Sequence, residues 1–154
     1  MRRALVATFI VLSLAACGDN GTPASKDKAP PAPEASARAP SPPGAKVFIL
    51  EPKDGAVVKS SVTVKFGVEG MELVPAGTDK PNSGHHHLLI DPKLEDYSAP
   101  IPADANHIHY GKAQTEAQIE LKPGKHTLQD VFGDKNHIPH DPPVQSDVVT
   151  ITVE

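Results

Sequence analysis

The residues of this chain best suited to chemistry are its eight histidines, none of which occurs before residue 85. They form three dense groups, within residues 84–87, 106–110 and 137–141, and one isolated position at His126. Imidazole nitrogens are preferred ligands of zinc and copper(II). The grouping therefore predicts a transition-metal site, for zinc or copper(II), that is built from histidine side chains.

The first two groups each contain the pattern His-x-His. In an extended strand, residues two positions apart point to the same side, with their Cα atoms about 6–7 Å apart. Two such imidazoles can reach a single ion, and a histidine from a loop can complete a shell of three or four ligands. The predicted metal ligands are His85, His87, His107, His109, His137 and His140.

The other two histidines are interpreted as packing residues. His86 alternates with Leu88 and is expected to face the core, and His126 follows a Pro-Gly turn. Copper(I) is disfavoured, because the domain lacks cysteine and contains only Met71 as a soft ligand. Four polar residues beside the groups are predicted to orient the second ring nitrogens, namely Asn106, Asp134, Asn136 and Asp141.

Three hypotheses for function follow from these groups. The first is a non-catalytic metal-binding module that acts as a carrier, a buffer or part of a sensor. The second is a metalloenzyme, but the sequence has neither a Gly-x-Ser-x-Gly nor a His-Glu-x-x-His motif, so no catalytic residue is assigned. The third is a structural, protein-binding or cell-wall-binding domain whose histidines form a hydrogen-bond network. A pH-responsive surface is the remaining interpretation of the histidines.

The strands that must carry the histidines are predicted from hydrophobic alternation with a period of two. They are residues 47–49, 61–69, 88–90, 108–110, 117–121, 126–132 and 149–153. Residues 92–105 contain three prolines and are predicted to form a loop, and no amphipathic helix is expected. About seven short antiparallel strands indicate an all-β, immunoglobulin-like sandwich, with a small open barrel as the alternative. Asp130 interrupts the alternation of Leu128 and Phe132, so we expect it to weaken that strand or to lie at an edge.

The first 45 residues are not expected to belong to the folded domain, which is assigned to residues 46–154. Residues 1–17 resemble a lipoprotein signal peptide that ends in the lipobox Leu-Ala-Ala-Cys, so Cys17 is the predicted lipidation site. An ordinary signal peptide that leaves a free thiol is the alternative. Residues 18–45 are rich in Pro, Ala and Ser and are predicted to be a disordered, semi-stiff linker.

This arrangement predicts a protein of the bacterial cell envelope on the periplasmic side. Two or more acyl chains on Cys17 would anchor it stably in a lipid bilayer. Gly18, rather than Asp, follows that cysteine, which favours the outer membrane.

The charge of the domain argues against two classes of partner. It contains ten Lys and no Arg against sixteen Asp and Glu, a net charge of −6, whereas the whole chain has −4. An acidic surface argues against nucleic-acid binding, and the lack of guanidinium groups argues against bidentate capture of anions. The single cysteine excludes a disulfide framework and a multi-cysteine metal site.

Three long strings that contain the histidine groups resemble the domain-of-unknown-function family 4399. They are PAGTDKPNSGHHHLLID at residues 75–91, NHIHYGK at 106–112 and GDKNHIPHDPPV at 133–144. The resemblance covers essentially the whole domain and implies a bacterial secreted protein, often with a signal peptide or lipoprotein signal. It also implies that the histidine groups belong to the family pattern, but it supplies no activity.

Overall fold

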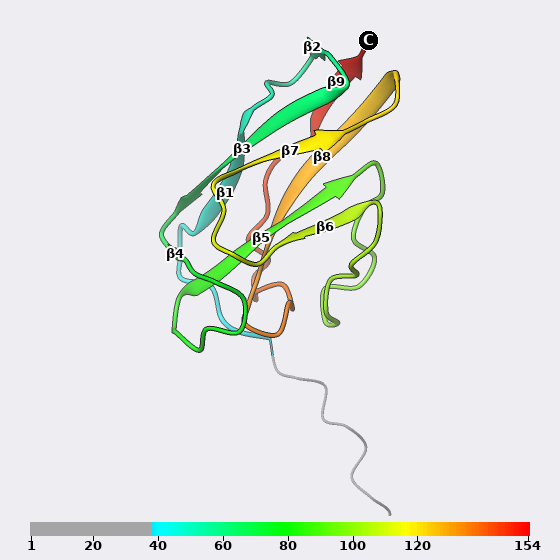
Figure 1. The fold of residues 1–154 in the computed structure, drawn as a ribbon. Helices are drawn as coiled ribbons and strands as arrows, with labels where there is room; N and C mark the ends of the chain where they lie inside the picture. Colours follow the sequence, from blue (N-terminus) through cyan, green and yellow to red (C-terminus); the bar gives the residue numbers. More distant parts are fainter. Residues whose placement is uncertain (1–37) are drawn as a thin grey trace, which may run out of the picture. The chain divides into compact units, whose positions relative to one another are not determined.

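The computed structural model describes residues 38–154, which form nine β-strands (Figure 1). In chain order these are β1 (Lys46–Glu51), β2 (Ala56–Val58), β3 (Ser61–Glu69), β4 (Glu72–Leu73), β5 (Ser83–Ile90), β6 (His107–Tyr110), β7 (Glu116–Glu120), β8 (Gly124–Gly133) and β9 (Val149–Val153). The predicted signal peptide, Cys17 and the linker up to residue 37 lie outside the described residues. Within residues 38–154 there is no helix long and apolar enough to cross a membrane.

The strands pair into two sheets that form a sandwich-like arrangement. The smaller sheet has the order β1-β3-β7, and the larger has the order β2-β9-β8-β5-β4, with β6 also paired to β5. Most pairs are antiparallel, whereas the β2–β9 and β4–β5 pairs are parallel. The predicted all-β sandwich is confirmed. The two strands that the sequence did not predict, β2 and β4, have three and two residues, too few to show an alternation.

The main core lies between the two sheets and follows from the period-two alternation. Val62, Val64 and Phe66 of β3 are buried, and the residues between them face outward. They belong to the same buried cluster as Leu88 of β5 and Ile151 of β9. Full burial of such a side chain contributes about 1.5–3 kcal/mol, so this layer supplies much of the driving force for folding.

Strand β5 is the exception to the alternation, because all eight of its residues are buried. Its core face packs against the smaller sheet. Its outer face is covered by the connection between β5 and β6, where Leu94 and Ile101 pack against Leu89 and Val131. Residues 92–105 thus form the predicted loop, and this loop gives the larger sheet a second apolar layer.

The prediction that Asp130 lies at an edge is wrong. Strand β8, which carries it, lies between β9 and β5, and the Asp130 side chain is fully buried. Its carboxylate lies 2.7 Å from Nδ1 of His86, and its backbone N–H donates to the hydroxyl of Ser146 at 2.9 Å. One carboxylate oxygen and the backbone N–H of Asp130 thus have polar partners, whereas the other buried oxygen, Oδ1, has none.

Residues 38–45, assigned to the linker from composition, contact the domain. The backbone N–H of Asp141 donates to the carbonyl of Ala39 at 2.9 Å, and the N–H of Ser41 donates to the carbonyl of Asp141 at 3.1 Å. In Figure 1 this first part of the described chain passes beside the loop that follows β8. The folded unit therefore begins before β1.

Candidate metal centre

Four of the six predicted ligands converge on the outer face of the larger sheet. His85 and His87 come from β5, His109 comes from β6, and His137 comes from the loop after β8. One ring nitrogen from each of these residues lies within 4.8 Å of all the others. We call these four residues the histidine cluster.

The sheet register explains how three members of the cluster meet. His85 and His87 are two positions apart on one strand and share its outer face, as the His-x-His pattern predicts. His87 is paired directly with His109 across β5 and β6, and His85 is paired with Gly133 across β5 and β8. The chain then turns back after Gly133, and this turn brings His137 over the same face.

The nitrogen separations fit a single transition-metal ion. Nε2 of His87 lies 3.0 Å from Nε2 of His85, and Nε2 of His85 lies 3.1 Å from Nδ1 of His137. Metal–nitrogen bonds of about 2.0–2.1 Å place neighbouring nitrogens about 3.3 Å apart in a tetrahedron and about 2.9 Å apart in a square. These two separations fall between those values, whereas the four nitrogens together lie within 4.8 Å, so some of the rings would have to move inward to complete either geometry.

The electrostatics of the cluster favour neutral imidazoles, the form that binds metals. Burial and the neighbouring rings of His109 and His137 lower the pKa of His85 to about 3. Burial and the rings of His85 and His109 lower the pKa of His87 to about 2. The pKa of His109 is lowered as well, by burial first and then by His137. These three lone pairs therefore need no deprotonation at neutral pH before they bind an ion.

Two members of the cluster are deeply buried and one opens to solvent. His85 and His87 expose no more than 1 % of their surface, whereas His109 is exposed and His137 is half-buried. His109 is therefore the member of the cluster that is most accessible to solvent.

A comparison with models of known protein families gives a match over the part of the chain that contains the histidine cluster. A family model described as a domain of unknown function, DUF4399, matches residues 64–154, which contain all four members of the cluster. The chain belongs to the DUF4399 family. This confirms the resemblance drawn from the histidine strings. Neither the curated proteins nor the solved structures contain a match to the chain.

Two glycines of the DUF4399 domain shape the cluster, and neither was predicted from the sequence. A Cβ atom on Gly133 would lie 2.9 Å from Nε2 of His87, and a Cβ atom on Gly111 would overlap with Cε1 of His109. Each imidazole thus packs directly on glycine backbone. The available signal was their place in the histidine strings, since Gly111 is two residues after His109 and Gly133 is four before His137.

The loop that carries His137 is organised by Asp134. Its Oδ1 atom accepts hydrogen bonds from the backbone N–H of Asn136 at 2.8 Å and of Ile138 at 2.9 Å. These bonds hold His137 between them in a left-handed conformation with φ of 66°. Asp134 therefore supports the cluster through the backbone rather than by contact with a ring nitrogen.

The other three residues predicted to orient rings have other roles in the described structure. The side chain of Asn106 donates to the carbonyl of Ile90 at 2.9 Å. Asn136 is exposed, and Asp141 pairs with Arg38 at 3.3 Å. Among residues 38–154, no predicted orienting residue hydrogen-bonds to an imidazole. The carboxylates that do contact histidine rings are Asp91, Asp104 and Asp130.

The structure does not bring His107 and His140 into the cluster. His107 shares a face with His109, as predicted, but it is paired opposite Leu89, and its Nδ1 lies 2.9 Å from Asp104. The ring of His140 is buried between the carbonyls of Phe132 and Ser83, with a nitrogen 3.2 Å from each.

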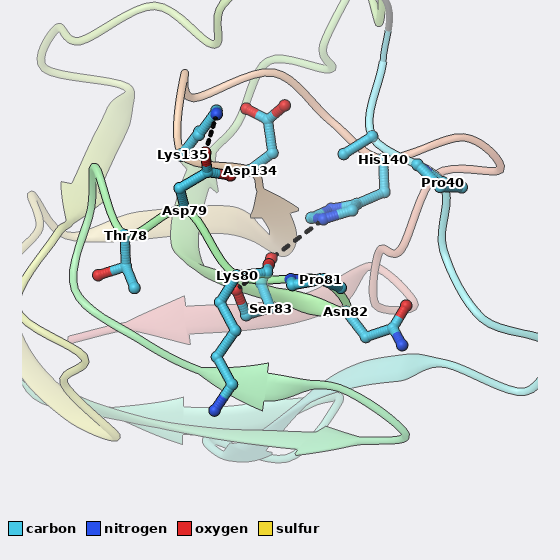
Figure 2. A pocket seen from close by; sticks show the side chains of 11 residues that line it. Pro40, Thr78, Asp79, Lys80, Pro81, Asn82, Ser83, Asp134, Lys135 and His140 are labelled. Carbon is cyan, nitrogen blue, oxygen red and sulfur yellow. Dashed lines mark hydrogen bonds and ion pairs between the residues drawn. The ribbon is translucent and has the colours of Figure 1, made fainter.

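His140 also lines a separate surface pocket, and its contact with Ser83 is visible in Figure 2. The pocket has a volume of about 280 Å³, and no member of the histidine cluster lines it. Charged side chains at its rim include Asp79 and Lys135, which form an ion pair of 2.8 Å.

The two histidines interpreted as packing residues lie where expected. His86 is fully buried on the core face, where its ring stacks on Phe66 with a centroid distance of 4.8 Å. His126 is half-buried, with one ring nitrogen 2.9 Å from Asp91 and the other 2.9 Å from the carbonyl of Lys122.

Proposed function

We propose that the DUF4399 domain of this chain binds one transition-metal ion, zinc or copper(II), through His85, His87, His109 and His137. The convergence of four imidazole nitrogens within 4.8 Å carries this proposal. In the proposed role the protein is a non-catalytic carrier, buffer or sensor part that is tethered to the cell envelope.

A structural hydrogen-bond network explains the histidine cluster less well. The close polar contacts of the His85 and His87 rings join imidazole nitrogens to one another, at 3.0 and 3.1 Å. In contrast, ring nitrogens of His86, His107, His126 and His140 contact carboxylate or carbonyl oxygens. Nitrogens that face other nitrogens are arranged like ligands around one ion rather than like a completed donor–acceptor network.

The donor set limits the kind of ion. All four donors are imidazole nitrogens, and no sulfur or carboxylate belongs to the described cluster. Imidazole suits zinc and copper, whereas magnesium and calcium require oxygen ligands. Zinc and copper(II) are therefore the ions to test first.

The number of donors supports a non-catalytic role. Catalytic zinc sites use three protein ligands and leave the fourth position for water or substrate. Four histidines would fill a tetrahedral shell completely. We therefore favour binding over hydrolysis for this site.

The proposed location rests on the N-terminal sequence alone. The lipobox cysteine Cys17 and the Pro-rich segment after it would attach the domain to the periplasmic face of a membrane, with the outer membrane favoured. A metal-binding domain in that position would meet ions that enter the envelope.

The proposal is tested by metal titration of the full chain, purified in detergent with its anchor. Calorimetry after chelator treatment should show one equivalent of Zn²⁺ or Cu²⁺ bound. The double substitution His109→Ala and His137→Ala should weaken binding by more than about 100-fold. It removes two of the four direct ligands, whereas loss of a residue that only supports a ligand already weakens metal binding by about 10–100-fold. His126→Ala is the matched control and should bind like the parent chain. Equal binding by the double variant would refute the site.

A further inference from the structure

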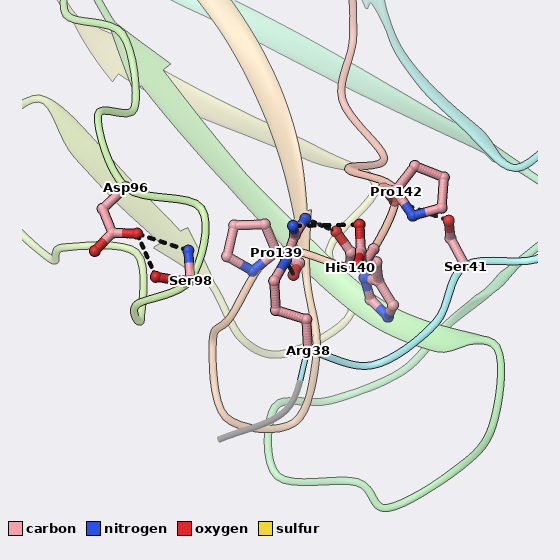
Figure 3. Close-up of polar contacts among 8 residues, drawn as sticks. Arg38, Ser41, Asp96, Ser98, Pro139, His140 and Pro142 are labelled. Atoms are coloured by element: carbon pink, nitrogen blue, oxygen red, sulfur yellow. Dashed lines mark hydrogen bonds and ion pairs between the residues drawn. The ribbon is translucent and has the colours of Figure 1, made fainter. Parts of the chain in front are cut away.

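Arg38 connects the start of the described chain to the loop that carries His137. Its Nε atom donates to the carbonyl of Pro139 at 3.0 Å, and its guanidinium also donates to the carbonyl of His140. The same group pairs with the Asp141 carboxylate at 3.3 Å. Figure 3 shows the side chain reaching across to residues 139 and 140. One planar group thus binds three consecutive residues.

The backbone next to Arg38 reinforces this contact. Ala39 and Ser41 exchange hydrogen bonds with the backbone of Asp141, and the hydroxyl of Ser41 donates to the carbonyl of Pro142 at 2.8 Å. Residues 38–41 therefore run along residues 139–142 as a short strap. Arg38 is the only arginine among the described residues, and no lysine could reproduce its fork of donors.

The strap acts on a segment that needs outside support. His137 has φ of 66°, a left-handed conformation that is unfavourable for a non-glycine residue and persists only when surrounding contacts enforce it. Asp134 supports the loop from the β8 side, and Ile101 donates to the His137 carbonyl at 2.9 Å. Arg38 holds the far end of the loop, two to four residues after His137.

We infer that Arg38 is a positioning residue for the metal centre, and this inference rests on the proposed metal-binding function. By fixing residues 139–141, Arg38 keeps the Nδ1 atom of His137 beside the nitrogens of His85 and His87. A ligand that is held in place before binding lowers the entropic cost of capturing the ion. If the loop without Arg38 occupied the competent arrangement about one tenth of the time, the apparent Kd would rise about tenfold.

The test is Cu²⁺ titration of the full chain and of Arg38→Ala, combined with electron paramagnetic resonance. We expect the Kd of the variant to rise about tenfold, and its spectrum to move toward that of His137→Ala, which lacks one nitrogen ligand. Arg38→Lys should recover only part of the affinity. Lys65→Ala, which removes a surface ion pair with Glu51 elsewhere in the fold, is the matched control and should change neither readout.

A double-mutant cycle separates positioning from general stability. In the His137→Ala background, Arg38→Ala should cause no further loss of affinity, because the group through which it acts is already gone. Circular dichroism of the metal-free proteins reports whether each variant is folded. If Arg38→Ala does not fold, Asp141→Asn takes its place in the cycle, since it removes only the carboxylate partner.

Two results would overturn the inference alone. These are an unchanged Kd and spectrum in the Arg38 variant, or a loss that persists at full size in the His137→Ala background. Failure of the parent chain to bind Cu²⁺ or Zn²⁺ would instead overturn the proposed function, and the inference with it.

Discussion

Nε2 of His85 lies 3.1 Å from Nδ1 of His137, although 52 residues separate the two in the chain. The same atom of His85 lies 3.0 Å from Nε2 of His87. His85 therefore contacts both the other histidine that β5 contributes to the cluster and the histidine that the loop contributes.

Metal binding should stabilise the folded domain. An ion at 100 times its Kd adds about 2.7 kcal/mol, which for a domain of this size raises the Tm by roughly 10 °C. The measurement is thermal unfolding by circular dichroism with chelator, Zn²⁺ or Cu²⁺. His85→Ala should abolish the shift and His126→Ala should preserve it. A Tm that is indifferent to metal and chelator would favour the structural hypothesis.

The metal-free domain should lose stability as the pH falls below about 6.5. The pKa of His85 is lowered to about 3 and that of His87 to about 2, while both return to about 6.5 on unfolding. The unfolded state then binds more protons across this window, so acid favours it. Each histidine that titrates contributes a slope of up to about 1.4 kcal/mol per pH unit.

This slope is measured by urea denaturation at several pH values between 7.5 and 4. The double substitution His85→Ala and His87→Ala should flatten the profile across that range. A profile that keeps its full slope in the double variant would assign the acid sensitivity to other groups.

Adding a methyl group at Gly133 should disturb the site through His87. The new Cβ atom would lie 2.9 Å from the Nε2 of that ring, so the ring must move away from its neighbours. We expect Gly133→Ala to lower metal affinity by about tenfold or more, a loss comparable to that of an outer-shell support. The turn residue Gly55 has open space around it and φ of 77°, so Gly55→Asn is a suitable control. Equal Kd values for both variants would contradict a role for Gly133.

The buried pair of His86 and Asp130 should matter for stability and not for metal binding. Its atoms lie 2.7 Å apart on the core face, opposite to the histidine cluster. Asp130→Ala leaves His86 without its partner and should cost about 3 kcal/mol in the free energy of unfolding. Urea denaturation measures this loss, and titration of the folded variant should return the parent Kd. A large loss of affinity would show that the two faces are coupled.

Lipidation of Cys17 is expected to hold the protein at the membrane. The chain with Cys17→Ser should move from the membrane fraction to the soluble fraction, because its anchor would lack acyl chains. Cell fractionation with labelled fatty acid checks both the position and the modification. Parent protein that is soluble and unlabelled would support the alternative of an ordinary signal peptide.

Local patterns predicted the strands and one feature of the site. The period-two alternation of Val62, Val64 and Phe66 predicted the core face of β3, because successive side chains of a strand point to opposite sides. The same rule placed His85 and His87 on one face. Spacing alone could not predict that Asp130 is buried, since its partner His86 lies 44 residues away on another strand.

The spacing of the histidines along the chain does not predict which of them join the cluster. His107 and His109 follow the same rule, yet sheet register pairs only His109 with His87 and leaves His107 two pairs farther along, opposite Leu89. Likewise, His137 and His140 lie in one loop, but only His137 joins the histidine cluster, whereas the ring of His140 lies between the carbonyls of Phe132 and Ser83.

The sequence by itself determined the all-β class, the faces of the strands and the set of histidines from which a metal site could be built. These features depend on neighbours within a few residues along the chain. Only the tertiary structure decided which four histidines converge, that Gly111 and Gly133 make room for them, and that Arg38 reaches their loop. Those relationships join positions up to about a hundred residues apart, and register and loop closure, rather than local spacing, fix such distances.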